Sequence, residues 1–150
     1  SLQEIADGLA GFANIKGRLQ IKHGIKGATL LDDTYNANPD SMKAALDVLA
    51  QLPAPRVFVM GDIGELGEDE SPAMHAEVGE YARNKGIEAA YFVGDFSASA
   101  AEAFGGQGLW FADKDPLIQV LVHELPENAN VLVKGSRFMK MEEVVEALQG

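Results

Sequence analysis

The sequence predicts an α/β domain with a doubly wound, mostly parallel sheet and helices on both faces. Short apolar segments that end at Gly or Asp alternate along the chain with longer segments of helical periodicity. The apolar segments are nearly continuous, which is typical of strands buried on both faces of a sheet. With 150 residues, 47% of them hydrophobic, the chain is long enough to bury one core. These observations together favour a single core built from β–α units.

Five segments are predicted as strands because each is short and rich in apolar, β-branched or aromatic residues. They span residues 28–31, 56–60, 89–93, 109–111 and 131–133. Ligands of parallel α/β sheets bind beyond the carboxyl ends of the strands, so we expect the functional residues to follow these segments. The candidates at these positions are Asp32, Asp33, Asp62, Asp95 and Lys134.

Six segments have the character of helices, with apolar residues mostly at helical spacing. They span residues 1–12, 39–51, 71–85, 96–104, 115–124 and 141–148. Asn38 is the predicted N-cap of the second helix, and Pro39 suits its first turn. Residues 13–27 are predicted to be a locally basic connector. Trp110 and the phenylalanines occupy core-like positions, and we give them no function.

The composition excludes several classes of protein. The chain carries 12 Lys and Arg against 23 Asp and Glu, a net charge of −11, which opposes binding to nucleic acid or to an anionic membrane. It contains no cysteine, which excludes disulfides, thiolate metal sites and cysteine nucleophiles. We find no apolar run of membrane-spanning length and no signal-peptide pattern, so we expect a cytoplasmic protein. Because it starts at Ser1, we also expect a processed or excised piece.

Several catalytic motifs are missing from the sequence. It contains neither a G-x-G-x-x-G fingerprint after its first strand nor a G-x-x-x-x-G-K-[ST] P-loop, so it lacks the usual cradle for a nucleoside triphosphate. It also lacks a G-x-S-x-G elbow and a pair of histidines at metal-ligand spacing. We therefore expect that this chain is not a complete catalyst on its own.

Residues 31–41 form the densest polar segment and follow the first predicted strand. Two carboxylates at a strand end can bind a metal ion or the hydroxyls of a ribose, and Tyr35, Asn36 and Asn38 add a ring and amide groups. The helix predicted from Pro39 would direct free N–H groups to the same place. The same residue types also form ordinary turns and caps, so both interpretations stay open.

Two further strand-end segments are candidates. Residues 61–67 include three glycines, which permit close approach of a ligand but are also common in plain surface loops. His75 lies in the next helix, where a lone histidine is more often structural than catalytic. After the last strand, Lys134, Ser136 and Arg137 can form a carboxylate-binding nest with Arg137 as a bidentate fork, or a polar loop without function.

At these segments the sequence resembles the C-terminal domain of the Mur ligases. The resemblance lies in Asp-Asp-Thr-Tyr-Asn-Ala-Asn-Pro-Asp-Ser at 32–41, in Met-Gly-Asp-Ile-Gly-Glu-Leu-Gly at 60–67 and in Val-Lys-Gly-Ser-Arg-Phe-Met-Lys-Met-Glu at 133–142. Gly17-Arg18-Leu19 is similar to the junction that precedes this domain in the family. Three long motifs in the right order, together with the junction, make the match specific and extend it over essentially the whole chain.

The resemblance implies a Rossmann-like sheet and a division of the chain. Residues 1–16 would be the tail of a central ATPase domain, residues 17–27 the junction, and residues 28–150 the Mur ligase C-terminal domain. The full enzyme would be an ATP-dependent ligase of peptidoglycan synthesis that joins D-alanyl-D-alanine to UDP-N-acetylmuramoyl-tripeptide through an acyl phosphate. Its central domain would hold most of the ATP and the Mg²⁺. This chain would bind the dipeptide and part of the ATP and would be inactive alone, and we expect a monomer.

The resemblance also implies roles for individual residues. On the nucleotide side, Arg18 and Asp33 would contact the phosphate and the ribose, and Tyr35, Asn36 and Asn38 would line the adenine or ribose. The residues expected to face the dipeptide, whose carboxylate needs positive charge, are Lys134, Ser136 and Arg137. The residues expected to support the loops between them are Asp62, Glu65 and His75. We expect neither a catalytic residue nor a metal ligand from this chain.

The alternative hypothesis is a phospho-receiver signalling domain. Such a domain also ends its first strand in paired acids and its last strand in a lysine, as Asp32, Asp33 and Lys134 do here. Its phosphate acceptor would be Asp95, after the third strand. Against this hypothesis, a glycine rather than a proline follows Lys134, and the segment after Asp95 carries none of the expected loop chemistry.

Overall fold

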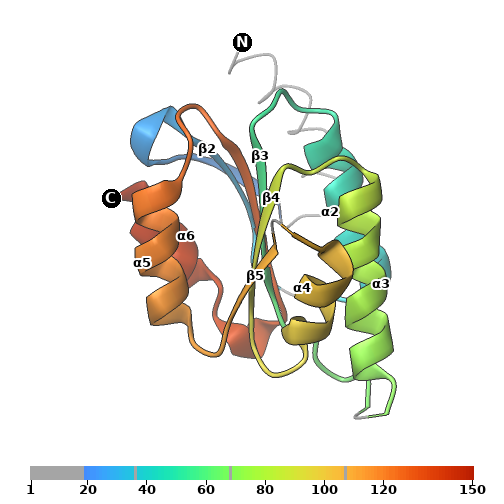
Figure 1. Cartoon of the computed structure of the whole chain (residues 1–150). Helices are drawn as coiled ribbons and strands as arrows, with labels where there is room; N and C mark the ends of the chain where they lie inside the picture. Colours follow the sequence, from blue (N-terminus) through green and yellow to red (C-terminus); the bar gives the residue numbers. More distant parts are fainter. Residues whose placement is uncertain (1–18, 36, 68, 107) are drawn as a thin grey trace.

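The fold is a mostly parallel sheet between two layers of helices (Figure 1). The computed structural model describes residues 19–35, 37–67, 69–106 and 108–150. Within these residues the strands are β1 (Gln20–His23), β2 (Thr29–Asp33), β3 (Arg56–Gly61), β4 (Ala89–Val93), β5 (Gly108–Phe111) and β6 (Asn130–Lys134). The helices are α2 (Pro39–Ala50), α3 (Ser71–Asn84), α4 (Ser97–Phe104), α5 (Lys114–Glu124) and α6 (Glu142–Gln149), with the 3₁₀ turns η1 (Ile25–Gly27) and η2 (Arg137–Met139).

The strand order β1-β2-β6-β3-β4-β5 is that of a doubly wound sheet. All neighbouring strands are parallel except β1, which pairs with β2 in the antiparallel sense. The predicted fold class is therefore confirmed. All five predicted strands and the five helices predicted between 39 and 148 are present, with ends that differ by at most a few residues. The helix predicted over residues 1–12 lies outside the described residues.

The prediction of a connector over residues 13–27 is wrong for the part that the structure describes, because Gln20–His23 is the edge strand β1. Its residues pair with β2, from Gln20 opposite Asp32 to His23 opposite Thr29. The strand was missed because it is short and only partly buried. An edge strand of four residues carries little of the apolar signal that identifies the central strands.

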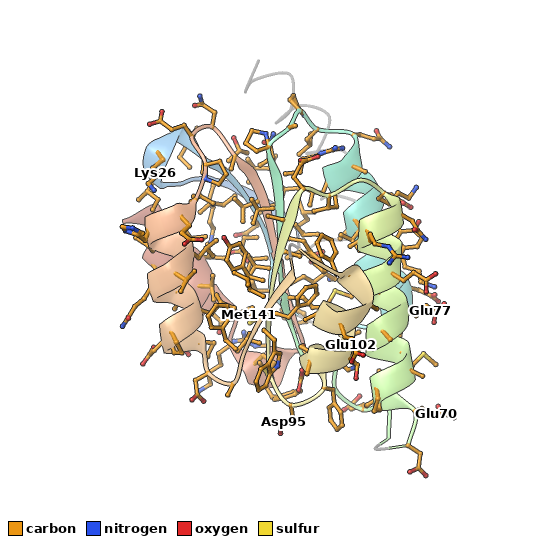
Figure 2. The ribbon with its side chains drawn as sticks, in the orientation of Figure 1. Lys26, Glu70, Glu77, Asp95, Glu102 and Met141 are labelled. Carbon is orange, nitrogen blue, oxygen red and sulfur yellow. The ribbon has the colours of Figure 1, made fainter. Side chains whose placement is uncertain are left out.

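Two apolar cores lie between the sheet and its helices, one on each face of the sheet. Residues that point to one face, such as Phe58, Met60 and Phe92, pack against α2, α3 and α4. Residues that alternate with them, such as Val57 and Val59, pack against α5 and α6 on the other face (Figure 1). In Figure 2, Glu77 and Glu102 lie on the outer side of the first helical layer, whereas Met141 is buried beside the sheet. This alternation along buried strands is the reason that the strands read as nearly continuous apolar runs.

Two aromatic residues that we placed in the core are exposed. Trp110 lies on the edge strand β5 and keeps 45% of its surface accessible, and Phe138 in η2 keeps 63%. The core-like interpretation holds for Phe58 and Phe92, which lie on central strands. The error has one cause, since apolar character in a sequence does not say whether a neighbouring element covers the residue.

The carboxyl ends of the parallel strands all lie on the same side of the molecule, the lower side in Figure 1. Because β6 lies between β2 and β3, the segments that follow these three strands become neighbours there. Those segments are the three that carry the polar motifs of the sequence. Among the described helices, none combines the length and the apolar character that crossing a membrane requires.

Candidate binding groove at the carboxyl ends of the strands

An open groove of about 620 Å³ lies beyond the carboxyl ends of these strands. It is lined by Ala37, Asn38, Gly64, Glu65, Leu66, Ser136, Arg137 and Phe138. The first two of these residues follow β2, the next three follow β3 and the last three follow β6. Segments that lie about 25 to 100 residues apart in the sequence therefore share one wall, as the switch-point rule for parallel sheets predicts.

Asp33 and Lys134 form a buried ion pair beneath this groove. Their charged atoms are 2.9 Å apart, and the lysine side chain keeps only 3% of its surface exposed. The pair forms because Asp33 and Lys134 are partners in the parallel register of β2 and β6. We predicted these residues for two different ligands, the nucleotide and the dipeptide, and the structure makes them partners of each other. Neither residue lines the groove, so their contacts with ligands stay predictions.

The neighbouring carboxylate, Asp32, is bound by a side chain of the edge strand β1. Its two oxygens accept from Lys22 Nζ at 2.6 Å and from Thr34 Oγ1 at 2.7 Å. Lys22 comes from β1, the strand that the sequence did not reveal. The structure thus separates the paired acids, since Asp32 pairs towards β1 and Asp33 towards β6.

The segment after β2 ends in a helix cap. Ser41 N donates to Asn38 Oδ1 at 2.8 Å, and Asn38 N donates to Ser41 Oγ at 3.0 Å, which confirms the predicted N-cap of α2. Asn38 also lines the groove, whereas Tyr35 on the same segment is 55% exposed. Two residues predicted for the nucleotide, Arg18 and Asn36, lie outside the described residues.

The segment after β3 is held in place by two buried side chains. The Asp62 carboxylate accepts from Phe96 N, Ser97 N and Ser97 Oγ at 2.7–3.2 Å, so it binds the first turn of α4. His75 Nε2 accepts from Ile63 N at 2.9 Å, and its Nδ1 lies 2.7 Å from Ser71 O. Because Nε2 accepts from Ile63 N, Nδ1 is the ring nitrogen that donates to Ser71 O. Apart from the Ser97 hydroxyl, the hydrogen-bond partners of both side chains are backbone groups.

Glu65, the third residue predicted to support this loop, is placed differently. It lines the groove and is exposed. Its φ of 64° lies in the left-handed region, which non-glycine residues adopt infrequently. Elsewhere in the part of the chain that the structure describes, we find no hydrogen bond or ion pair to its carboxylate.

The segment after β6 lines one side of the groove and is hydrogen-bonded to the segment after β3. Gly64 N donates to Ser136 Oγ at 2.5 Å, and Ser136 N donates to the Asp62 carbonyl at 3.0 Å. Phe138 packs directly over Gly64, where an added Cβ would lie 2.9 Å from the Phe138 ring. The two segments therefore form one continuous wall.

Arg137 presents its guanidinium at the surface of this wall. Its Nη1 donates to Glu142 Oε1 at 3.0 Å, and its side chain is 64% exposed. Glu142 is the first residue of α6, and it was not among the predicted site residues. The only signal for it was its place five residues after Arg137 at the start of a predicted helix. Phe138 was missed as a lining residue because we placed it in the core.

Metal binding finds no support in the described side chains. Among them, no three His, Cys, Asp or Glu residues lie close enough together to hold an ion. Of the two carboxylates that we considered for this purpose, Asp32 is already engaged with Lys22 and Thr34, and Asp33 with Lys134.

The sheet order overturns the phospho-receiver hypothesis. Two strands, β6 and β3, separate β2 from β4, so Asp95 after β4 is three strand positions away from Asp32 and Asp33. Strands are spaced by about 4.8 Å, which puts the predicted acceptor roughly 14 Å from the paired acids. Asp95 is exposed at the lower edge in Figure 2. It cannot share a phosphorylation site with the acids and Lys134.

The sequence matches a known protein family over most of its length. Residues 17–137 match the family described as Mur ligase, glutamate ligase domain. The UDP-N-acetylmuramoyl-tripeptide–D-alanyl-D-alanine ligase of Escherichia coli (strain K12) is 46% identical over 151 residues, which cover 99% of this chain and 33% of that protein. The ligase of the same name from Haemophilus influenzae is 41% identical over 155 residues, again with 99% and 33% coverage. The chain thus spans about a third of the length of these curated relatives.

Solved structures show the same fold. A crystal structure of MurF from Acinetobacter baumannii superposes with a TM-score of 0.80 at 35% sequence identity, covering 89% of this chain and 30% of that one. The MurF ligase of Thermotoga maritima, solved in complex with ADP, superposes with a TM-score of 0.76 at 26% identity, covering 89% of this chain and 30% of that one.

Proposed function

The chain belongs to the Mur ligase family, as its glutamate ligase domain, and we propose that it forms the dipeptide-binding wall of a ligase that joins D-alanyl-D-alanine to UDP-N-acetylmuramoyl-tripeptide. One observation carries this proposal. The three motif segments, which are far apart in the sequence, line a single groove. Identities of 46% and 41% to two ligases of this name support the choice of substrates.

The ligase reaction divides the work between this domain and the rest of the enzyme. We propose that ATP activates the tripeptide carboxyl as an acyl phosphate, and that the amine of the dipeptide then displaces phosphate. The P-loop that this sequence lacks would lie in a central domain, which would also hold the Mg²⁺. The solved relative in complex with ADP supports nucleotide binding by such ligases. Closure of this domain over the central one would align the amine with the acyl phosphate and exclude water.

Arg137 and Ser136 are the residues that we propose for the dipeptide. Arg137 offers an exposed guanidinium in the groove, and its fork geometry suits a carboxylate. Ser136 lines the groove, and its Oγ accepts from Gly64 N. The buried Asp33–Lys134 pair would support these residues from below and extend towards the nucleotide.

The nucleotide would lie towards the segment after β2. Tyr35 is exposed there, and Asn38 faces the groove. Arg18 and Asn36 complete this proposed set. For the chain as a whole we propose residues 1–16 as the tail of the central domain and 17–27 as the junction, with β1 of the junction built into the sheet of the C-terminal domain.

Replacing Arg137 by Ala in the full-length ligase tests the proposal. The loss of a charge-assisted contact should cost about 1.5–3 kcal/mol, which is about a tenfold or larger rise in the KM for D-alanyl-D-alanine. The KM for ATP should change little. The measurement is steady-state phosphate release at varied dipeptide concentration. Arg83→Ala, on the exposed surface of α3, is the matched control. An unchanged dipeptide KM in Arg137→Ala would remove this residue from the site.

A further inference from the structure

We propose that Glu65 binds the ammonium group of the incoming dipeptide, so that the groove recognises both charged ends of a short zwitterionic peptide. The inference rests on the proposed function and adds a specificity residue to it. It assigns the dipeptide's carboxylate to the β6 side of the groove and its amine to the β3 side.

The groove contains one exposed group of each charge. Arg137 comes from the segment after β6, and Glu65 from the segment after β3. Arg137 donates to Glu142 from one guanidinium nitrogen, and its remaining N–H groups can donate to a ligand. The Glu65 carboxylate has no partner among the residues that the structure describes. A ligand with a carboxylate at one end and an ammonium at the other therefore complements the groove.

The backbone at Glu65 provides a second, independent observation. Its φ is 64°, in a region where glycine would fit without strain. Gly64 precedes it and Gly67 follows closely, so the sequence places a charged residue where a glycine would be easier to accommodate. The residue before it is anchored, because Gly64 N donates to Ser136 Oγ. Residues held in such conformations cluster at ligand sites.

Apolar groups lie in the groove together with the two charges. Ala37, Leu66 and Phe138 contribute apolar surface to the wall, and Phe138 keeps 63% of its surface exposed. A dipeptide with two methyl side chains would cover part of this surface, whereas a dipeptide with charged side chains would bury a charge against it. The volume of about 620 Å³ falls in the range of small-molecule sites.

The test compares two ligands on the full-length ligase. The ligands are D-alanyl-D-alanine and its N-acetyl derivative, which lacks the positive charge and cannot react. Dissociation constants are measured by calorimetry for the wild type and for Glu65→Gln. We expect Glu65→Gln to weaken binding of the free-amine dipeptide about five- to tenfold. Binding of the N-acetyl dipeptide should stay within about twofold of the wild-type value, because the contact is already absent from that complex.

Two further variants sharpen the test. Glu70→Gln changes a neighbouring exposed carboxylate, labelled in Figure 2, and should leave both dissociation constants unchanged. Glu65→Gly removes the carboxylate and suits the left-handed backbone, so it should lose the preference for the free amine without a fall in melting temperature. This variant keeps the result interpretable if Glu65→Gln disturbs the loop.

Each result has a distinct meaning. If Glu65→Gln weakens both dipeptides equally, the residue acts only on the loop and the inference is overturned. The inference is also overturned if the wild type binds the free-amine dipeptide and both Glu65 variants bind it equally well, while the proposed function survives. If the wild type binds no dipeptide and forms no product, the proposed function fails and takes this inference with it.

Discussion

Asp62 uses both carboxylate oxygens to hold the first turn of α4. A strand-end aspartate in a glycine-rich loop is typical of a ligand-binding residue, and this position made Asp62 a candidate. Its partners are the backbone of Phe96 and both the backbone and side chain of Ser97, which lie about 35 residues further along the chain. Like His75, which accepts from Ile63 N, it fixes the shape of the loop that carries Glu65.

At this scale we predict the effect of Asp62→Ala on stability. The change leaves buried N–H donors of α4 without an acceptor, which should lower the free energy of unfolding by about 1–3 kcal/mol. Asp62→Asn should lose less, because its amide oxygen still accepts. Urea denaturation followed by circular dichroism measures the difference. Equal midpoints for the wild type and Asp62→Ala would show that these hydrogen bonds do not stabilise the fold.

The helices α3 and α4 are in close contact because α3 has no side chain at Gly79. A Cβ added there would lie 2.1 Å from the carbonyl oxygen of Ala100 in α4. Both helices pack on the same face of the sheet and are side by side in Figure 1. Through Asp62, the position of α4 is coupled to the loop after β3, so the contact between these helices contributes to the shape of the groove.

Gly79→Ala is therefore the test at the scale of elements. The methyl group collides with backbone rather than with a flexible side chain, so α4 must move, at a cost of about 1–3 kcal/mol. Gly106→Ala is the matched control, since a Cβ at Gly106 meets nothing within 4 Å. Thermal unfolding of both variants measures the outcome. A melting temperature for Gly79→Ala that equals that of Gly106→Ala would contradict the close approach of the two helices.

The three polar segments meet beyond the carboxyl ends of the strands, and the groove between them is open. The groove lies beyond β2, β6 and β3 and is bounded on one side by segments of this chain. The sequence contains no P-loop, and the chain spans about a third of the length of the related ligases. A surface of this kind suits one wall of a site that a second domain completes.

We accordingly predict that this chain alone does not catalyse the ligation. Incubated with UDP-N-acetylmuramoyl-tripeptide, D-alanyl-D-alanine and ATP with Mg²⁺, it should release no phosphate above background. The full-length ligase is the positive control, and a cooperative unfolding transition of the chain shows that it is folded in the assay. Turnover by the chain alone would refute the proposal that the phosphate-activating machinery lies elsewhere.

The fold class, nearly all the central elements and the three segments that form the groove could be predicted from the amino-acid sequence alone. This was possible because burial on both faces leaves continuous apolar runs, and because parallel strands direct their carboxyl ends to one edge. Ser136 and Arg137, which the sequence singled out after the last strand, both line the groove, and their contacts with a ligand stay predictions.

Which of these polar residues meet, and which face the groove, became clear only from the three-dimensional arrangement of the strands and helices. Asp33 pairs with Lys134 because the register of β2 and β6 places them side by side, and Asp62 turns away to cap α4. Phe138 and Trp110 are exposed although their apolar character suggested the core. A side chain's chemistry is local to the sequence, but its partners and its exposure are set by elements that lie far away along the chain. The sequence therefore could not settle them.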